Sequence, residues 1–214
     1  SQSTIRRDLK ELEQQGEIEM FHGGGVRLKK ESVELDLEQK MVLNREEKER
    51  IAAFAVKLIH TGDVIFLDPS SVNALLIDCL KEEEDISVVT NSIAHINKLV
   101  RRRIPCTLIG GDIKSVTCSC IGTIAEQELR EFRFSKCFLG ANGISVEFGI
   151  SNHDPRERAI KRIAINNSVQ TYFLIDSVKY GVSSMCKVAD FDECTIITGK
   201  QIPQMDGWKN VIVA

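Results

Sequence analysis

The spacing of hydrophobic positions changes along the chain, from helical periodicity at its start to short continuous runs further on. Ile5, Leu9 and Leu12 are three or four positions apart, which places them on one face of a helix. This spacing predicts a helix over residues 4–15. Gly16 follows directly, and glycine is the residue that most often ends a helix.

The segment after this helix has the pattern of a β-hairpin. Apolar and polar residues alternate over 17–21, as in a half-buried strand. Three glycines at 23–25 permit a tight turn, and we expect 26–28 to be the returning strand. Residues 29–45 are mostly charged and are interpreted as a linker, partly helical. A second amphipathic helix is predicted over 46–60.

From residue 64 onward, short apolar runs alternate with helical stretches. Continuous runs rich in Val, Ile, Leu and Phe are typical of strands buried on both faces of a parallel sheet. The order of strands and helices predicts an α/β domain over residues 46–214, with a mostly parallel sheet and flanking helices. The predicted strands are 64–67, 87–89, 107–109, 136–139, 171–175, 195–197 and 211–213, and the predicted helices between them include 72–80, 93–102 and 156–167.

Composition excludes several protein classes. Apolar content of 43%, charged content of 28% and a net charge of −3 describe an ordinary globular protein. Nucleic-acid binding must therefore come from a local patch. No apolar run approaches the roughly 20 residues needed to span a bilayer. The seven cysteines show no paired metal-binding spacing, which favours reduced thiols in a cytoplasmic protein without a disulfide framework, metal or cofactor.

The start of the first helix carries candidate DNA-binding residues. Recognition helices contact base edges and phosphates with polar and basic residues of their first turns. The candidates are Ser3, Thr4, Arg6, Arg7 and Lys10, with His22 at the hairpin turn. An ordinary amphipathic helix with a solvated basic face explains the same pattern, so spacing alone leaves both interpretations open.

Polar residues and glycines follow several predicted strands of the α/β domain. Asp68, Thr90 with Asn91, Gly110 with Gly111, and Asp176 each come just after a strand. Ligands of parallel sheets bind outside the carboxyl ends of the strands, so we expect these residues to converge. Ser70 and Ser71 precede a predicted helix, whose N-terminal N–H groups and dipole suit a phosphate. Lys161 and Lys179 are expected to supply positive charge.

The first 26 residues resemble the DeoR family of bacterial transcriptional regulators. The resemblance rests on Thr-Ile-Arg-Arg-Asp-Leu at 4–9, Leu-Glu-Gln-Gln-Gly at 12–16 and His-Gly-Gly at 22–24. It implies that 4–9 begins the recognition helix of a winged helix-turn-helix and that 22–24 closes the wing. Two helices precede this run in the family, so residues 1–28 are expected to be a partial DNA-binding domain that binds operator DNA poorly without them.

The α/β domain resembles the effector domain of the same family. The matching phrases include 62–68, 89–92, 108–111, 138–144, 154–157 with Lys161, and 176–177 with Lys179. The resemblance implies a Rossmann-like fold related to ribose-5-phosphate isomerase and glucosamine-6-phosphate deaminase, which senses phosphorylated sugars. The predicted ligand-binding residues are Asp68, Ser70, Ser71, Thr90, Asn91, Gly110, Gly111, Asn142, Gly143, Asp154, Glu157, Lys161, Asp176 and Lys179.

Each of these features also has a purely structural explanation. Ser70 or Ser71 is explained equally well as the cap of the helix that follows, because serine caps helices in many proteins. The glycine pair at 110–111 is explained equally well as a turn. Asp154-Pro155 followed by Glu157 resembles a capping box with proline at the first helical position. Glu157 and Lys161 are four residues apart and are equally explained as a surface ion pair.

The function predicted from the sequence is a non-enzymatic repressor of a carbohydrate catabolic operon. Operator binding is expected to be controlled by a phosphorylated sugar, in a homodimer or homotetramer without membrane association. The alternative is a sugar-phosphate isomerase or deaminase, which needs a positioned general base. Asn142 stands in the loop where related isomerases carry acidic residues, and an amide is no base. A third interpretation is a bare oligomerising ligand-binding domain.

Overall fold

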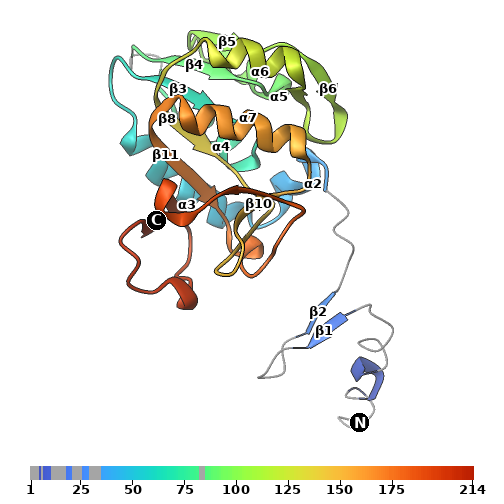
Figure 1. The fold of residues 1–214 in the computed structure, drawn as a ribbon. Coiled ribbons are helices and arrows are strands. Elements are labelled where there is room, and N and C mark those ends of the chain that lie inside the picture. Colours follow the sequence, from blue (N-terminus) through green and yellow to red (C-terminus); the bar gives the residue numbers. More distant parts are fainter. Residues whose placement is uncertain (1–4, 6, 11–17, 21–25, 29–34, 82–84) are drawn as a thin grey trace. The chain divides into compact units, whose positions relative to one another are not determined.

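The computed structural model describes residues 5, 7–10, 18–20, 26–28, 35–81 and 85–214, which form two compact units, 1–34 and 35–214. In the first unit, residues 7–10 are helical. β1 (Ile18–Met20) and β2 (Val26–Leu28) pair antiparallel, with Glu19 opposite Arg27, as the predicted hairpin requires (Figure 1).

The second unit is organised around a seven-stranded sheet in which every neighbouring pair is parallel. Its order is β14-β13-β11-β8-β3-β4-β5, so the chain starts in the middle and extends first to one edge, then to the other. The predicted mostly parallel α/β sheet is confirmed. The strands are β3 (Val64–Leu67), β4 (Ser87–Thr90), β5 (Cys106–Leu108), β8 (Phe134–Leu139), β11 (Ser168–Ile175), β13 (Thr195–Thr198) and β14 (Val211–Val213).

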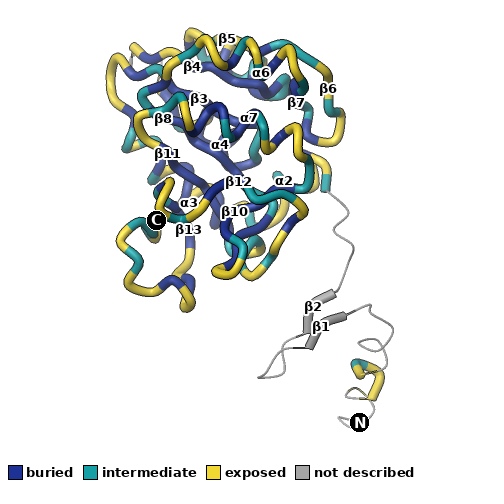
Figure 2. Tube along the Cα trace, viewed as in Figure 1, coloured by how far each residue is buried: buried dark blue, intermediate teal, exposed yellow. Residues whose placement is uncertain are grey.

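Helices cover both faces of this sheet. One core packs strand residues against α3, α4 and α5, and a second packs the alternate strand residues against α6 and α7. Figure 1 shows α7 crossing one face of the sheet, and Figure 2 shows the central strands buried along most of their length. The helix bounds are α3 (Arg45–Ala55), α4 (Ser71–Cys79), α5 (Ile93–Arg101), α6 (Thr123–Arg130) and α7 (Pro155–Asn166).

Strand periodicity explains why both cores form. Ile65 and Leu67 of β3 lie in the core with α3 and α4, whereas Phe66 between them lies in the other. Side chains of a strand point alternately to its two faces. A run of apolar residues without polar alternation therefore buries both faces. All three are fully buried, which places β3 in the centre of a three-layer structure.

A short helix, α2 (Leu37–Val42), precedes α3 within the segment that the sequence analysis interpreted as a linker. Asp36 forms a capping box with Gln39 at its start, each side chain bonding the other residue's backbone N–H. Such reciprocal caps stabilise short helices. Residues 35–45 therefore lie in the second unit rather than between two domains.

Two small antiparallel sheets and five 3₁₀ turns have no counterpart in the predicted element list. Strands of three or four residues with little alternation give a weak sequence signal. Among the described residues, no helix is long and apolar enough to cross a membrane. The small strands are β6 (Asp112–Lys114), β7 (Ser119–Ile121), β9 (Gly143–Ser145), β10 (Gly149–Asn152) and β12 (Cys186–Ala189), and the turns are η1 (Val56–Leu58), η2 (Ser115–Thr117), η3 (Ser177–Lys179), η4 (Phe191–Glu193) and η5 (Pro203–Met205).

Candidate functional site at the carboxyl edge of the sheet

A buried ion pair lies where β3 and β8 end. Lys161 of α7 donates from Nζ to Oδ2 of Asp68, the residue after β3, and to the carbonyl oxygen of Gly140, the residue after β8, at 2.9 Å. The Lys161 and Asp68 side chains are only 7% and 2% exposed. Strand, loop and helix residues that are far apart in sequence thus meet at the end of β3, where Asp68 was expected.

Asp68 accepts further hydrogen bonds that fix its carboxylate. The Gly140 N–H donates to Oδ2 at 2.8 Å, and the Ser70 N–H donates to Oδ1 at 3.2 Å. The side chain of Asn73 donates from Nδ2 to Oδ1 at 2.8 Å. Charge-assisted bonds of this kind are the stronger ones in proteins, so the carboxylate is held in one orientation.

Asn73 is a site residue that the sequence analysis missed. It is fully buried in the first turn of α4, and its Nδ2 also donates to the Phe138 carbonyl oxygen at 2.7 Å. Its Oδ1 has no hydrogen-bond partner in the described part of the chain. The sequence signal for this site residue was an asparagine in the first turn of an otherwise apolar helix, because a buried amide needs specific hydrogen-bond partners.

Gly140 is required by close packing against α4. A Cβ built on this residue would lie 2.5 Å from Cβ of Ser70, closer than two carbon atoms approach without displacement. The bare backbone therefore lets the β8 loop approach the start of α4, and both Gly140 backbone groups bond the Asp68–Lys161 pair. Gly140 was not singled out in the sequence analysis.

Ser70 and Ser71 lie at the N-terminus of α4. Ser70 is the N-cap, and its side chain accepts from the Asn73 N–H at 3.3 Å. The capping explanation for Ser70 is therefore correct. Ser71 is the first helical residue and is 7% exposed. The Asn73 N–H is thus satisfied by the cap, and the positive end of the helix dipole at this terminus is compatible with an anion.

Thr90 and Asn91 tie the end of β4 to its surroundings. The Thr90 hydroxyl donates to the Leu67 carbonyl oxygen at 2.6 Å, and Asn91 Nδ2 donates to the Cys120 carbonyl oxygen at 2.9 Å. The Cys120 N–H in turn donates to the Asn91 carbonyl oxygen at 2.8 Å. The predicted pair therefore lies beside Asp68 and also anchors the β6–β7 hairpin.

Glu157 on α7 is buried with polar partners. It accepts from the Thr117 hydroxyl at 2.8 Å and from Asn152 Nδ2 at 3.0 Å, and Lys114 Nζ lies 3.3 Å from its carboxylate. Because Glu157 and Lys161 are both only 6% exposed, they are not a surface ion pair. Lys161 bonds Asp68 instead, so the two residues belong to separate buried clusters.

Asp154 is the N-cap of α7, as predicted, but the expected capping box does not form, because the Glu157 carboxylate bonds Thr117 and Asn152. Its side chain accepts from the Arg156 N–H at 2.8 Å, and Pro155 occupies the first helical position. The Arg156 guanidinium also bonds both carboxylate oxygens. These side-chain bonds, with the backbone bond and nearby positive charge, lower the pKa of Asp154 to about 2. A capping carboxylate paired with its own helix needs no ligand to explain it.

The other predicted loop residues are held by packing. A Cβ on Gly111 would lie 2.6 Å from the Ile121 carbonyl oxygen, and one on Gly143 would overlap the Val182 carbonyl oxygen. The Gly110 N–H donates to Glu128 Oε2 at 2.8 Å. Asn142 Oδ1 accepts from the His153 N–H at 3.2 Å. Packing and backbone hydrogen bonds therefore account for these glycines and for Asn142 without a ligand.

Asp176, after β11, pairs with a residue that the sequence analysis did not single out. Lys48 of α3 places its Nζ 3.5 Å from Asp176 Oδ2, and each side chain is 3% exposed. The same Nζ donates to the Leu43 carbonyl oxygen at 2.6 Å and to that of Lys40 at the end of α2. Lys179 ends the 3₁₀ turn that Asp176 caps.

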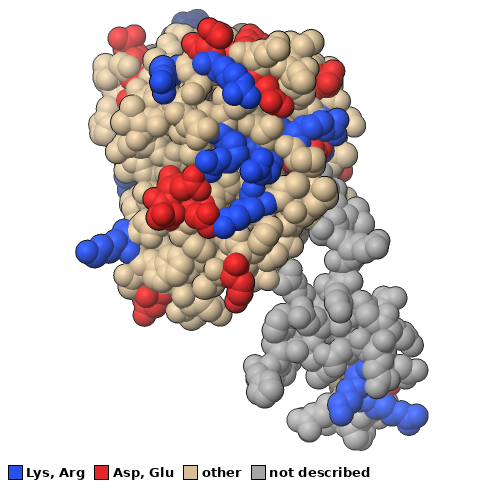
Figure 3. Space-filling view, viewed as in Figure 1, with Lys and Arg blue, Asp and Glu red and all other residues tan. Residues whose placement is uncertain are grey.

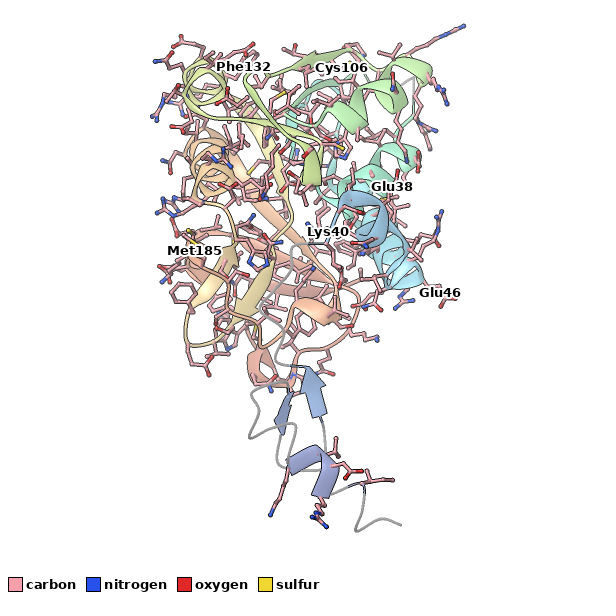
Figure 4. All side chains as sticks on the ribbon, turned by 90° about the vertical axis from the view of Figure 1, so that its right-hand side faces the viewer. Glu38, Lys40, Glu46, Cys106, Phe132 and Met185 are labelled. Atoms are coloured by element: carbon pink, nitrogen blue, oxygen red, sulfur yellow. The ribbon has the colours of Figure 1, made fainter. Side chains whose placement is uncertain are left out.

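Glu47, next to Lys48, extends this cluster. Its carboxylate accepts from the Ser177 N–H at 2.9 Å and from the Ser177 hydroxyl at 2.7 Å. In Figure 4, Glu38 and Lys40 lie on α2 and Glu46 lies at one end of α3. We call Lys48, Glu47, Asp176 and Ser177 the Lys48 cluster, which joins α2 and α3 to the carboxyl edge of the sheet.

The predicted DNA-binding residues are only partly described. Arg7 and Lys10 are exposed, and Ile5 is 60% exposed. In the second unit, acidic side chains lie close to basic ones on the face shown in Figure 3. Arg162 and Glu193, for example, form an ion pair at 2.7 Å. The candidates outside the described residues are Ser3, Thr4, Arg6 and His22.

The described residues contain no cluster of three or more His, Cys, Asp or Glu side chains placed to hold a metal ion. The charged and polar groups at the carboxyl edge include the Asp68–Lys161 pair, the N-cap Ser70 and the buried amide of Asn73.

Comparison with known proteins matches both units to one family. Residues 43–200 match the model of the DeoR C-terminal sensor domain, and residues 1–31 match that of the DeoR-like helix-turn-helix domain. The chain is 38% identical over 198 residues to the uncharacterized HTH-type transcriptional regulator FruR of Bacillus subtilis, covering 92% of this chain and 79% of that protein. It is 32% identical over 202 residues to the lactose phosphotransferase system repressor of Staphylococcus epidermidis, covering 90% and 78%.

Solved structures share the fold of the second unit. The δ subunit of eIF2B from Chaetomium thermophilum superposes with a TM-score of 0.52 at 16% identity, over 78% of this chain and 59% of that one. Ribose-5-phosphate isomerase A from Methanocaldococcus jannaschii gives a TM-score of 0.48 at 22% identity, over 64% of this chain and just over half, 55%, of that one. At 16% identity, the likeness to the eIF2B subunit indicates the fold alone.

Proposed function

The chain belongs to the DeoR family of transcriptional regulators, and from this premise we propose that it represses a carbohydrate catabolic operon under the control of a phosphorylated sugar. In this proposal the helix-turn-helix unit binds operator DNA and the carboxyl edge of the sheet binds the effector. The observation that carries it is the buried Asp68–Lys161 pair beside the N-terminus of α4.

This arrangement suits a phosphate for two reasons. Lys161 supplies a cation in a poorly solvated place, where its attraction to an anion is little screened. The first turn of α4 supplies backbone N–H groups and the positive end of its dipole. Asp68 keeps Lys161 compensated when no anion is bound.

Control of DNA binding requires that the effector bind the DNA-competent and DNA-incompetent states with different affinity. The Lys48 cluster supplies a physical connection within the second unit. Asp176 lies at the carboxyl edge, and Lys48 joins it to carbonyl oxygens at the end of α2. The chain runs from the helix-turn-helix unit into α2. A ligand that displaces Asp176 would therefore also displace α2, where the connection to that unit starts.

The enzymatic alternative is not favoured. The matching relatives are named as transcriptional regulators and repressors rather than isomerases or deaminases. Within the site, the Asp68 carboxylate is occupied by Lys161, Gly140 and Asn73, which leaves it poorly placed to act as a general base. We expect a coupled isomerase assay to give turnover no higher than the blank.

Thermal melting with a panel of pentose and hexose phosphates tests the proposal. At 100 times its Kd a ligand stabilises the folded state by about 2.7 kcal/mol, or roughly 5–10 °C for a domain of this size. We expect one phosphorylated sugar to produce such a shift and its unphosphorylated parent to produce none. Equal shifts from both, or none from any sugar phosphate, would refute the site.

Variants separate the site from general stability. Lys161→Met should abolish the ligand shift, whereas Lys57→Met, at an exposed position on η1, should leave it unchanged. The double variant Lys161→Met with Asp68→Asn removes the unpaired carboxylate and should fold while remaining unresponsive. The active sugar phosphate should also change the affinity of the protein for promoter DNA in fluorescence anisotropy. We expect the binding form to be a homodimer or homotetramer, because helix-turn-helix proteins usually read paired half-sites.

A further inference from the structure

The turn between β4 and α5 concentrates buried polar atoms that have no hydrogen-bond partner in the described part of the chain. These atoms are Oδ1 of Asn91 and Oγ of Ser92. The His95 ring, in the first turn of α5, lies near the Ser70 backbone, but among the described residues neither ring nitrogen has a partner with the distance and angle of a hydrogen bond. The three residues are 2%, 0% and 0% exposed. Buried polar groups are nearly always hydrogen-bonded in native proteins, so several of them at one turn indicate a place built to contact something else.

This turn adjoins the Asp68–Lys161 pair. Thr90 lies opposite Leu67 in the parallel register of β4 and β3, so the residues that follow each strand are neighbours. The Thr90 hydroxyl donates to the Leu67 carbonyl oxygen at 2.6 Å and accepts from the Ser92 N–H at 3.0 Å. The unpartnered atoms therefore lie beside the place where the phosphate is proposed to bind.

The three side chains are also held in place by their backbone. Asn91 and Cys120 exchange hydrogen bonds, and the Ile93 N–H donates to the Cys118 carbonyl oxygen at 2.9 Å. Because Asn91 Nδ2 is committed to Cys120, its Oδ1 points elsewhere and remains an acceptor. A fixed geometry reduces the entropy lost on binding, as in preorganised sites.

The chemistry of these atoms fits hydroxyl groups. Burial lowers the pKa of His95 to about 4, so the ring is neutral and presents one donor and one acceptor. The Ser92 hydroxyl both donates and accepts, and Asn91 Oδ1 accepts. A sugar hydroxyl matches both roles, whereas a phosphate or carboxylate offers only acceptors and needs a cation. Lys98, on the same helix, is paired with Asp78 at 2.7 Å.

We propose that Asn91, Ser92 and His95 form a subsite for the uncharged, hydroxyl-bearing end of the effector, whose phosphate binds at Lys161. The effector is then a sugar monophosphate rather than a bisphosphate or a sugar acid. This inference rests on the proposed function, because it places the two ends of one ligand on neighbouring strand ends. The β6–β7 hairpin bonds this turn and must move for the ligand to enter.

The test compares ligand binding by the full chain and its variants, using calorimetry and melting. The probes are fructose 6-phosphate, ribose 5-phosphate and other monophosphates, the matching bisphosphates, sugar acids and inorganic phosphate. Ser92→Ala and His95→Gln should each weaken the active monophosphate roughly tenfold, as expected for one lost hydrogen bond. Both variants should retain the affinity of the unsubstituted chain for inorganic phosphate, whereas Lys161→Met should lose both ligands.

Deoxy analogues of the active monophosphate provide a second measurement that does not depend on how well a variant folds. In the unsubstituted chain, removal of the contacted hydroxyl should cost about as much affinity as Ser92→Ala. If the chain binds a monophosphate but no deoxy analogue or subsite variant loses affinity, the subsite is wrong and the proposed function stands. A preference for a bisphosphate or sugar acid also overturns the subsite. If no sugar phosphate produces a response, both the subsite and the proposed function are overturned.

Discussion

Replacing Lys48 with methionine tests whether the Lys48 cluster fastens α2 to the carboxyl edge of the sheet. Lys48 and Asp176 are each 3% exposed in their side chains, so methionine leaves the Asp176 carboxylate buried without its cation. Breaking a buried pair from one side costs about 3–5 kcal/mol. Domains are stable by about 5–15 kcal/mol in total, so the loss is a large fraction.

The expected readout is a lower melting temperature. For a domain of this size, each kcal/mol corresponds to roughly 2–4 °C, so Lys48→Met should lower the Tm by roughly 6–20 °C in differential scanning calorimetry at pH 7. The matched control is Lys57→Met, which removes an exposed lysine from η1 and should change the Tm little. Amide hydrogen exchange should also rise in α2, because Lys48 bonds the carbonyl oxygens of Lys40 and Leu43.

A double variant distinguishes an unpaired charge from a packing defect. Lys48→Met combined with Asp176→Asn removes both charges, and replacement of a whole buried pair is often close to neutral. We expect this combination to recover at least half of the lost stability. A Tm of Lys48→Met within about 2 °C of that of Lys57→Met would refute the reasoning, as would a double variant less stable than the single one.

Three further predictions follow from individual residues. Burial lowers the pKa of His95 from 6.5 to about 4, so the folded state is favoured above pH 6.5 and loses stability as the pH falls toward 4. In His95→Gln, the urea midpoint of unfolding should depend less on pH over this interval. Hydrogen bonds from Arg156 lower the pKa of Asp154 from 3.8 to about 2, so stability that is present above pH 3.8 is lost as the pH falls toward 2. Asp154→Asn keeps the cap and should reduce this loss of stability at acid pH. An unchanged pH dependence would contradict the assignment. Gly140→Ala should cost about 1–3 kcal/mol in urea unfolding, because the added Cβ meets Ser70 at 2.5 Å, whereas Gly110→Ala, with 3.6 Å to its nearest atom, should be tolerated better.

Local pattern in the sequence determined the elements and their class. The apolar run at 64–67 contains no polar alternation, and it became the central strand β3 with side chains in both cores. The helices at 72–80 and 156–167 were found within one residue of α4 and α7, because apolar periodicity and the capping residues Ser70 and Asp154 mark their starts. These features depend on neighbours in the chain, which a sequence displays directly.

Strand ends also predicted the centre of the candidate site. Parallel strands bring their carboxyl ends to one edge, so Asp68 and Asn91 could be expected on a common edge before any contact was known. Lys161 was expected there only as a source of positive charge, and it bonds Asp68. Asp176 was expected in the same crevice, but its partner is Lys48. The roles assigned to Gly111 and Gly143 did not follow, because a glycine needed for packing has the same sequence signature as one that approaches a ligand.

What the sequence by itself determined was the order of elements, the parallel sheet and a polar edge that includes Asp68, because each follows from periodicity and chain direction. Only the tertiary structure decided which charges are partners. Lys161 pairs with Asp68, 93 residues away, rather than with Glu157 one turn before it on the same helix. Lys48 is indistinguishable in sequence from its solvated neighbours until α3 packs against the sheet and buries it beside Asp176. Pairing of this kind depends on which distant surfaces meet, and burial then makes each unpaired charge or amide costly enough to select its partner.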